Sequence, residues 1–496
     1  MRFHISSIVT KVRKQFDARW LIIIAIAAFL RLYNISSFAT FLGDQGRDAL
    51  IMQDIATLRH FPAIGPPTSV GLVYMGPFFY YLMAPFLLIA NFNPLGLAIG
   101  TAILSVLAII FVGSMVVYYT NKKTALLFML VLAFSSLLID SAKYAWNPNL
   151  LPYFAFATFF FYYTMLRENN HIAGFLTGLF FGFSIQLHPL VLLTIVPLGL
   201  GVFFNLFRTK SKKNYIPILT SLVGFIVAIS PLIIFDLRHD FINTQSLLTL
   251  FHTNSATKIS ITLMSFWQTI YSLLQIAIPF PSQFKIIALS IIAYILYLSV
   301  YRAIREKNIF ILMHFGILIA YILLFTLVKV EKFPHYYGSV ILSLYLVLIY
   351  PLLYGTCTKC KVGGILVICA YIIINALRFN FLLSVGSNQI QRAKDIAHEI
   401  APHITKGPYQ LATIPFVEAD EHYRYFLSRE LNHRQLDERS LEQPSELFIL
   451  CFEPCKATDD AQWVIASFKD KHIQEKFTVQ NITIYKVVHK RATILK

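Results

Sequence analysis

Long apolar segments dominate this chain and limit what it can fold into. Each is close to the roughly 20 residues that an α-helix needs to cross the hydrocarbon layer of a membrane. Of the 496 residues, 57% are hydrophobic and only 14% are charged, a balance that a soluble protein of this length could not keep in solution. The sequence therefore predicts an all-α polytopic membrane protein. About eleven spans are expected, at 20–38, 96–119, 124–140, 150–166, 171–187, 189–207, 215–235, 285–302, 309–328, 335–354 and 363–384.

The orientation of the spans depends on one further apolar stretch, 76–91, which is short and contains Pro85. If it does not cross the membrane, the N-terminus and five short loops lie on one side and carry 17 basic and three acidic residues. The segments of 1–386 on the opposite side then carry ten basic and seven acidic residues. Basic residues accumulate on the cytoplasmic side. We therefore expect 76–91 at the outer surface, a cytoplasmic N-terminus with an uncleaved signal anchor, and the C-terminus outside the plasma membrane. The five loops are 121–123, 167–170, 208–213, 302–307 and 356–361.

The net charge of +17 indicates a membrane partner and not a nucleic acid. Residues 1–386 carry 27 basic and ten acidic side chains, whereas the remaining residues carry 15 of each. The whole excess therefore lies in the apolar part of the chain, in short loops between spans. Lipid bilayer is the partner that this distribution predicts.

Two domains are expected: a transmembrane domain over 1–386, with outer loops at 39–95 and 236–284, and a soluble extracytoplasmic domain over 387–496. Each outer loop contains an amphipathic stretch that would form a helix, either resting on the membrane surface or packed against its neighbours. The apolar positions are Leu50, Ile51, Ile55 and Leu58 in the first loop, and Trp267, Ile270, Leu274 and Ile278 in the second.

The tail over 387–496 predicts a small α/β domain. We expect helices near 390–400, 418–430 and 459–468, and strands at 409–414, 447–452 and 482–488. Cys451 and Cys455 would pair in an oxidising compartment or remain as separate thiols. Cys357 and Cys360 lie beside lysines without a second pair or a histidine, so their spacing is only weak support for a zinc site.

Acidic residues are scarce in 1–386, so their positions are informative. Asp44, Arg47 and Asp48 follow the first span directly. A carboxylate beside an arginine at the membrane surface can act as a general base toward a hydroxyl group, while the cation binds an anion. Alternatively, Asp44 is the N-cap of the amphipathic helix, with Arg47 and Asp48 in its first turn. Seven carboxylates fall on the outer side: Asp44, Asp48, Asp54, Asp140, Asp236, Asp240 and Glu331.

Further outer-side residues are candidates, each with a structural alternative. Lys143 would bind an anion or would only extend its amine toward water, and Asn147 follows it in the same segment. His188 precedes Pro189, which would otherwise simply form a turn. The segment 332–337 combines a cation, an imidazole and two hydroxyl groups. Its residues Lys332, His335 and Tyr336 are the last of the candidate site residues. The run 238–240 is more typical of a solvated group of charges. All these candidates gather at one face of the membrane, which favours a surface enzyme over a transporter with polar groups at the midplane.

Three short motifs resemble those of a known family. Arg31-Leu-Tyr33 ends the first span, Gly43-Asp44-Gln45-Gly46 follows in the first outer loop, and Gly76-Pro77-Phe-Phe-Tyr80-Tyr81 opens a second helix of that loop. The order of these motifs is similar to that of the GT-C membrane glycosyltransferases, in the branch of the protein O-mannosyltransferases and the lipid A aminoarabinose transferases. The family's topology agrees with the one expected from the charges.

The resemblance implies transfer of a sugar from a polyprenyl-phosphate donor to a hydroxyl acceptor, with inversion at the anomeric carbon. Asp44 would be the general base, with Asp48 as a substitute for a second acidic residue that is Gln45 here. Arg47, Lys143, His188 and the group at 332–336 would meet the charge of the phosphate. His188 stands where relatives often carry a lysine, so its cation would depend on protonation. Asn147 or Asn149 occupies the place of a further expected carboxylate, unless Asp140 serves.

No cofactor is expected. A divalent metal is possible but not indicated, because the Asp-x-Asp motif of other branches does not occur in 1–386. Two other functions stay open at this point. A lipid-linked glycan transporter or flippase would need essential residues at the membrane midplane, and a non-catalytic envelope assembly protein would tolerate Asp44→Asn.

Overall fold

The computed structural model describes residues 10, 13–68, 73–209, 215–255, 263–328, 331–352, 358–405, 407–430, 435–436 and 442–490. Cys357 and parts of the loops 208–213 and 356–361 lie outside them. The chain forms two compact units. The first unit contains Met1–Tyr33, Phe61–Met83 and Ile99–Ser384, and the second contains Asn34–His60, Ala84–Ala98 and Val385–Lys496.

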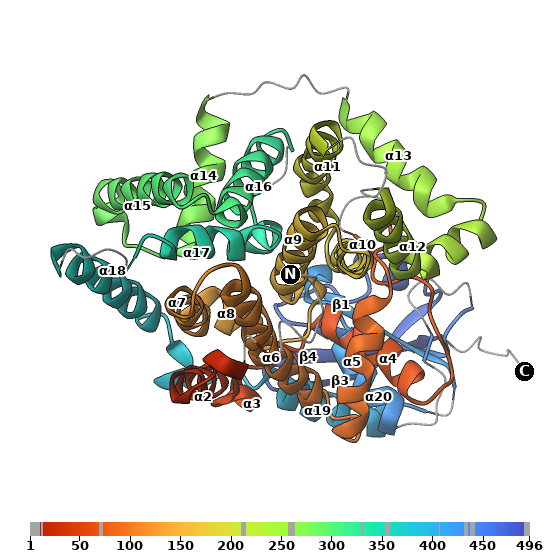
Figure 1. Ribbon diagram of the computed structural model, residues 1–496. Helices are drawn as coiled ribbons and strands as arrows, with labels where there is room; N and C mark the ends of the chain where they lie inside the picture. Colours follow the sequence, from red (N-terminus) through yellow and green to blue (C-terminus); the bar gives the residue numbers. More distant parts are fainter. Residues whose placement is uncertain are drawn as a thin grey trace, which may run out of the picture. The chain divides into compact units, whose positions relative to one another are not determined.

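The first unit is helical (Figure 1). Its α-helices are α2 (Ala18–Leu32), α7 (Lys122–Phe134), α8 (Ser136–Ser141), α9 (Leu151–Glu168), α10 (His171–Leu187), α11 (Ile195–Thr209), α12 (Tyr215–Arg238), α13 (Ile242–Ser255), α14 (Leu263–Ala277), α15 (Lys285–Arg305), α16 (Ile309–Thr326), α17 (Ile341–Ile349) and α18 (Thr358–Ala376). Short 3₁₀ turns connect them: η1 (Asn147–Asn149), η2 (Pro189–Thr194), η4 (Ser282–Phe284), η5 (Pro334–Tyr337) and η6 (Asn380–Leu382). Two further helices, α5 (Phe78–Ile89) and α6 (Leu95–Tyr119), contain residues of both units.

Six helical segments of the described chain are long and apolar enough to cross a membrane, and each overlaps a predicted span. The helix at 171–187, which was also predicted as a span, and α5 are shorter apolar helices. The mostly helical, multi-pass architecture is therefore confirmed, whereas the total of eleven spans stays a prediction. The six segments are Leu95–Tyr119, Pro189–Arg208, Tyr215–Arg238, Ser282–Arg305, Ile309–Thr326 and Thr358–Ala376.

Tertiary contacts break one predicted span. The sequence predicts a continuous helix over 124–140, but α7 ends at Phe134 and α8 begins at Ser136. At this break, Ser136 donates hydrogen bonds from its backbone N and Oγ to Asn375 Oδ1, both at 2.9 Å. The Arg31 guanidinium donates to the carbonyls of Leu132 and Ala133 at 3.0 and 3.3 Å. Side chains distant in sequence thus replace the bonds that a continuous helix would make.

Two other predicted spans differ at their ends. The one at 335–354 opens with η5, and its α-helix, α17, covers only nine residues. The one at 20–38 divides at Asn34, whose φ of 53° lies in the left-handed region, so that α2 and the short α3 (Ile35–Phe38) are separate. Asparagine tolerates this conformation better than other non-glycine residues, which explains the position of the break.

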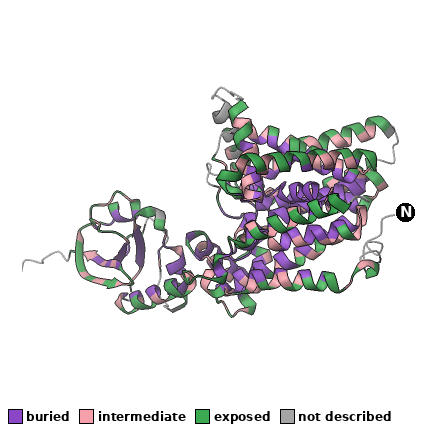
Figure 2. Ribbon diagram, turned by 90° about the vertical axis from the view of Figure 1, so that its left-hand side faces the viewer, coloured by how far each residue is buried: buried purple, intermediate pink, exposed green. Residues whose placement is uncertain are grey.

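Small residues allow the helices of the first unit to pack closely. α10 and α12 lie side by side (Figure 1), and a Cβ atom on Gly178 of α10 would stand 1.8 Å from the carbonyl oxygen of Ser221. Close backbone contact of this kind is typical of helix pairs in membranes. Elsewhere on α12, Leu219, Leu222 and Val223 stay exposed, as expected for side chains that face lipid. Exposed positions occur along many helices of the chain (Figure 2).

The second unit contains α3, α4 (Gly43–Ala56) and a four-stranded sheet of order β1-β2-β4-β3. β1 (Tyr409–Ile414) pairs in parallel with β2 (Glu446–Cys451), while β4 (Ile482–His489) is antiparallel to β2 and to β3 (Lys471–Val479). Its helices are α19 (Gln389–Ile400), α20 (Glu421–Glu430) and α21 (Trp463–Ala466), with 3₁₀ turns η7 (Ala401–His403) and η8 (Phe416–Glu418).

This unit confirms the small C-terminal sheet. The helix expected over 459–468 is limited to the four residues of α21, and β3 was not predicted. β3 is an edge strand with largely exposed or half-buried side chains, so it lacks the apolar alternation that marks a buried strand. Cys451 and Cys455 form a disulfide.

Candidate functional site

The first group of candidate residues lies in the second unit, at the start of α4. Arg47 binds two carboxylates there: its Nη1 lies 2.9 Å from Asp44 Oδ1, and its Nη2 lies 2.8 Å from Asp48 Oδ1. The two acids differ in exposure, since the Asp44 side chain is 51% exposed and that of Asp48 only 3%. The structure therefore leaves one of the two predicted catalytic acids accessible and encloses the other.

Asp44 is not the N-cap of α4. The N-cap is Leu42, and its backbone N–H donates to Gln45 Oε1 at 3.1 Å. The Gln45 side chain thus caps the start of the helix, and Asp44 is the second residue of α4. The N-cap position considered for Asp44 from the sequence is wrong, and Asp44 instead lies in the first turn of α4 with an ion pair to Arg47. The described residues make no hydrogen bond to Asp44 Oδ2, so this oxygen is open to solvent or a ligand.

Close packing of α4 against α20 fixes the group. A Cβ atom on Gly46 would stand 2.4 Å from the backbone N of His422, so only glycine fits. A Cβ atom on Gly43 would stand 2.5 Å from the Cβ of Ala419 and 3.0 Å from Glu421 Oε2. His422 is buried, and this burial lowers its pKa to about 4. Its Nδ1 has no hydrogen-bond partner in the described part of the chain. Sequence analysis did not single out this α20 pair, because nothing local relates it to the first outer loop.

The second group lies in the first unit, around a cavity of about 260 Å³. Asp140, Tyr144, Trp146, Asn149 and His335 are among the residues that line it. The cavity is therefore walled by aromatic rings and contains several hydrogen-bonding groups. Apolar walls with a few polar groups are typical of small-molecule binding sites.

Four rings meet beside this cavity. The His335 ring centroid lies 4.7 Å from Trp146, 5.4 Å from His188 and 4.3 Å from Tyr336. The structure thus brings together His188, His335 and Tyr336, which are separated by almost 150 residues in sequence. The His188 Nδ1 accepts a hydrogen bond from the backbone N of Leu190 at 3.3 Å. Burial, with a smaller effect of His335, lowers the pKa of His188 to about 3. His188 is neutral at pH 7, and its Nε2–H is a donor and not a cation.

Lys143 is buried in the same unit, with its Nζ 3.0 Å from the centre of the Phe381 ring. Burial lowers its pKa to about 8, although the nearby Asp140 opposes this effect. Asn147 is fully buried, and neither its Nδ2 nor its Oδ1 has a hydrogen-bond partner in the described part of the chain. Buried amides are almost always paired, so an unpaired one indicates a missing ligand or water.

Lys332 has a different environment. Its Nζ donates to the carbonyls of Phe325 and Val328 at 2.9 and 2.8 Å, at the C-terminal end of α16. Burial lowers its pKa to about 8. A cation in this position satisfies terminal carbonyls and interacts favourably with the helix dipole. The contacts of Lys332 are those of a helix cap.

Gln186 is a further residue that the sequence did not reveal. Its Oε1 accepts from the backbone N of Phe78 at 3.2 Å, and its Nε2 donates to Ala228 O at 2.8 Å. It therefore joins the Gly76-Pro77 motif to α10, two residues before His188. A single glutamine in an apolar segment carries no signal of such a contact.

No group of three or more His, Cys, Asp or Glu side chains in the described residues could hold a metal ion. The predicted absence of a cofactor stays a prediction.

Comparison with known proteins fits this arrangement. Residues 75–235 match the family of dolichyl-phosphate-mannose-protein mannosyltransferases. The fold is similar to that of ArnT from Cupriavidus metallidurans bound to undecaprenyl phosphate, with a TM-score of 0.59 and 11% identity, covering 94% of this chain and 98% of that one. The chain resembles the GT-C membrane glycosyltransferases. The matched GT-C segment contains Lys143, Asn147 and His188, whereas Asp44 precedes it.

A second GT-C structure has a related fold. The oligosaccharyltransferase from Archaeoglobus fulgidus, in complex with Zn and sulfate, aligns with a TM-score of 0.51 and 12% identity, covering 84% of this chain and 62% of that one. No curated protein matches by sequence. At these identities the structural likeness concerns the fold. It supports a multi-pass membrane protein, as the apolar helices already indicate.

Proposed function

We propose that the protein is an integral-membrane glycosyltransferase that moves a sugar from a polyprenyl-phosphate donor to a hydroxyl acceptor on the extracytoplasmic face. In this reaction the acceptor oxygen bonds to the anomeric carbon as the bond to the phosphate oxygen breaks, with inversion. The acceptor proton goes to Asp44, and the carrier phosphate leaves as an anion. The undecaprenyl phosphate bound to the Cupriavidus ArnT supports a lipid donor of this class.

The observation that carries the proposal is the difference between Asp44 and Asp48. Both contact Arg47, but the Asp44 side chain is 51% exposed and that of Asp48 only 3%, so a ligand can reach Asp44 alone of the two. A general base must reach the proton that it removes, so Asp44 is the base and Asp48 anchors the arginine. Arg47 orients both carboxylates, and a contact of its own with the phosphate stays a prediction.

The groups of the first unit suit a phosphate without a metal. Lys143 supplies a buried cation, while His188 and Tyr336 supply neutral hydrogen-bond donors and Asn147 an unpaired amide. Donors fixed in a poorly solvated place stabilise developing negative charge strongly, because they need no reorganisation during the reaction. We assign these four residues to the donor phosphate and its sugar. Lys332 is left out, because its amine caps α16.

Sugar transfer by membranes that contain the protein tests the proposal. The donors are labelled polyprenyl-phosphate sugars of several kinds, and native envelope extract supplies the acceptor. We expect Asp44→Asn to lower the rate by roughly 10²–10⁴-fold, the usual contribution of a general base. Asp54→Asn is the matched control, because Asp54 lies on the same helix and, among the described residues, its carboxylate is paired with the exposed Arg59 alone. Undiminished transfer by the Asp44→Asn variant would remove Asp44 from the mechanism, and no transfer from any donor would favour the transporter or assembly functions.

A further inference from the structure

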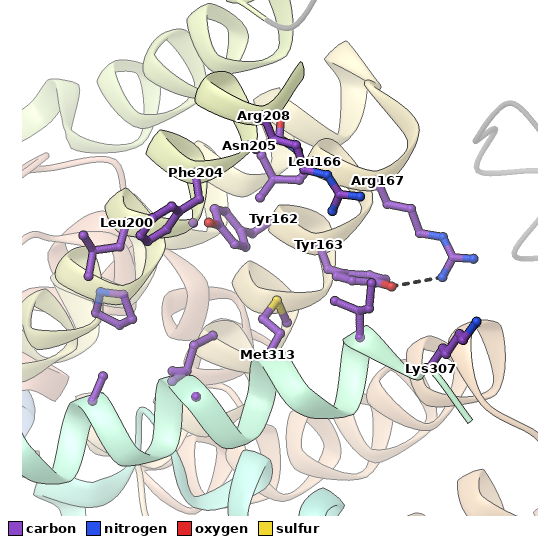
Figure 3. A pocket seen from close by; sticks show the side chains of 16 residues that line it. Tyr162, Tyr163, Leu166, Arg167, Leu200, Phe204, Asn205, Arg208, Lys307 and Met313 are labelled. Atoms are coloured by element: carbon purple, nitrogen blue, oxygen red, sulfur yellow. Dashed lines mark hydrogen bonds between the residues drawn. The ribbon is translucent and has the colours of Figure 1, made fainter. Parts of the chain in front are cut away.

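A second and larger cavity lies in the first unit, between α9, α11 and α16 (Figure 3). Its volume is about 810 Å³. Asn147 lies just before the start of α9, and the new cavity lies at the other end of this helix. The lining residues of α9 begin at Tyr162, eleven residues after Leu151, so at a rise of about 1.5 Å per residue the cavity begins roughly 17 Å along the helix from the Asn147 end. This cavity is therefore distinct from the proposed transfer site.

Three cations gather at one end of the cavity (Figure 3): Arg167 near the end of α9, Arg208 near the end of α11 and Lys307 before α16. All three are exposed, and no carboxylate is among the lining residues. The neighbouring acids make hydrogen bonds or ion pairs with residues outside the cavity. Glu168 accepts hydrogen bonds from Tyr118 and Tyr119, and Glu306 is held by Arg302 and Tyr350. Tyrosine hydrogen bonds leave the Glu168 carboxylate charged, and its charge acts on Arg167, but the three lining cations outnumber it, so the net local charge is positive.

The rest of the cavity is apolar. Leu200 and Phe204 of α11 face Met313 and Ile317 of α16, and α16 lines it as far as Ala320. From Ile309 to Ala320, α16 rises by roughly 17 Å at 1.5 Å per residue. One leaflet of a typical bilayer has a hydrocarbon depth of about 15 Å, half of the total thickness. The length of the groove along α16 therefore matches the hydrocarbon depth of one leaflet, which an acyl chain fills.

We propose that this groove binds one anionic phospholipid, with its phosphate at Arg167, Arg208 and Lys307 and an acyl chain along α16. Charge complementarity selects the headgroup, and the depth of the apolar part selects a lipid over a free phosphate. Basic pockets between transmembrane helices on the cytoplasmic side commonly hold anionic headgroups. The charge distribution of the sequence predicts that all three cations face the cytoplasm. The site goes beyond the proposed transfer function and does not depend on it.

The test uses the full-length protein in phosphatidylcholine nanodiscs that contain a minority of phosphatidylglycerol, with native mass spectrometry to count the lipids that stay bound. We expect one phosphatidylglycerol to be retained in preference to phosphatidylcholine. The triple substitution Arg167→Gln, Arg208→Gln and Lys307→Gln should weaken retention by roughly fivefold for each cation removed. Arg305→Gln is the matched control, since Arg305 is an exposed cation two residues before Lys307 that does not line the cavity.

A second pair of variants tests the apolar part. A Cβ atom on Gly316 meets no atom within 4 Å, and Gly316 lines the cavity, so the side chain of Gly316→Leu would extend into the groove. Gly199 of α11 has equally free space but lies outside the lining, which makes Gly199→Leu the control. We expect only Gly316→Leu to release the lipid. Equal retention of the two phospholipids, equal loss in the control variants, or preference for added polyprenyl phosphate over phosphatidylglycerol would each overturn the proposal.

Discussion

Arg47 binds two carboxylates that face different surroundings. Asp48 is enclosed, so the ion pair that it makes with Arg47 is shielded from solvent, whereas Asp44 meets water on one side. A charge pair loses much of its strength when it is exposed. Asp48 therefore fixes the arginine, and the arginine in turn limits the positions that the Asp44 carboxylate can take. A single cation thus holds the proposed base in place without enclosing it.

The protonation of Lys143 predicts how donor binding depends on pH. Burial lowers its pKa to about 8, from an ordinary value near 10.5. The amine is charged below pH 8 and neutral above it, while a phosphodiester keeps its negative charge throughout. We expect the KM for the lipid donor to rise as the pH increases through about 8, with a smaller change in kcat.

The variant Lys143→Arg tests whether deprotonation of Lys143 causes the rise in KM. Arginine stays protonated in the whole range, so its KM should no longer rise above pH 8. Lys332 also has a pKa lowered to about 8. Because its amine caps α16, Lys332→Arg should leave the pH dependence in place. Persistence of the rise in the Lys143→Arg enzyme would contradict the assignment.

The packing of α4 against α20 determines the position of Asp44. α4 approaches α20 so closely that Gly46 touches the backbone at His422. Gly46→Ala would require the two helices to separate. We expect a loss of about 1–3 kcal/mol in the stability of the second unit, the usual cost of overpacking. Faster hydrogen exchange in α4 and α20 is the measurement. Gly363→Ala is the control, because a Cβ atom there meets nothing within 4 Å.

The break between α7 and α8 yields a second prediction for elements. Arg31→Met removes the donors that bind Leu132 O and Ala133 O in a buried environment. An acceptor left unpaired in such a place costs about 1–3 kcal/mol. We therefore expect a lower thermal midpoint in detergent, measured by loss of helical circular dichroism. Arg19→Met should change it little, because the Arg19 side chain is 62% exposed. A midpoint equal to that of the wild type would show that water replaces the arginine.

The same elements show what a sequence can and cannot predict. Apolar periodicity located α4, α14 and most spans, because burial on one face leaves a local pattern. The break at Ser135 was not predictable, since the atoms that hold it belong to Asn375 and Arg31. Scarcity of acids pointed to Asp44, but the neutral state of His188 depends on a fold that buries it. Contacts distant in sequence decided each feature that the pattern missed.

For the whole molecule, the distribution of basic residues predicts a cytoplasmic N-terminus and an external C-terminal domain. Cys360 and Asp459 are exposed and fall on opposite sides in this topology. A chain that retains Cys360, with Cys357→Ser and Cys369→Ser, should react with an impermeant maleimide only after the cells are permeabilised. The further variant Cys360→Ser with Asp459→Cys should react in intact cells. The reverse pattern would invert the topology, and with it the side assigned to the proposed reaction.

The second unit gathers pieces of the chain that the ribosome produces at different times. Tyr425 and Arg429 of α20 donate to the carbonyl of Phe92, and α20 also covers α4, yet almost 300 residues separate Ala98 from Val385. Synthesis proceeds at about 5–20 residues per second, so these early segments wait for roughly 15–60 s before their partners exist. During this interval α4 lacks the surface against which Gly46 packs. The proposed active carboxylate is therefore among the first parts to be made and among the last to be positioned, and a chain truncated before α20 would insert its early spans without forming a competent enzyme.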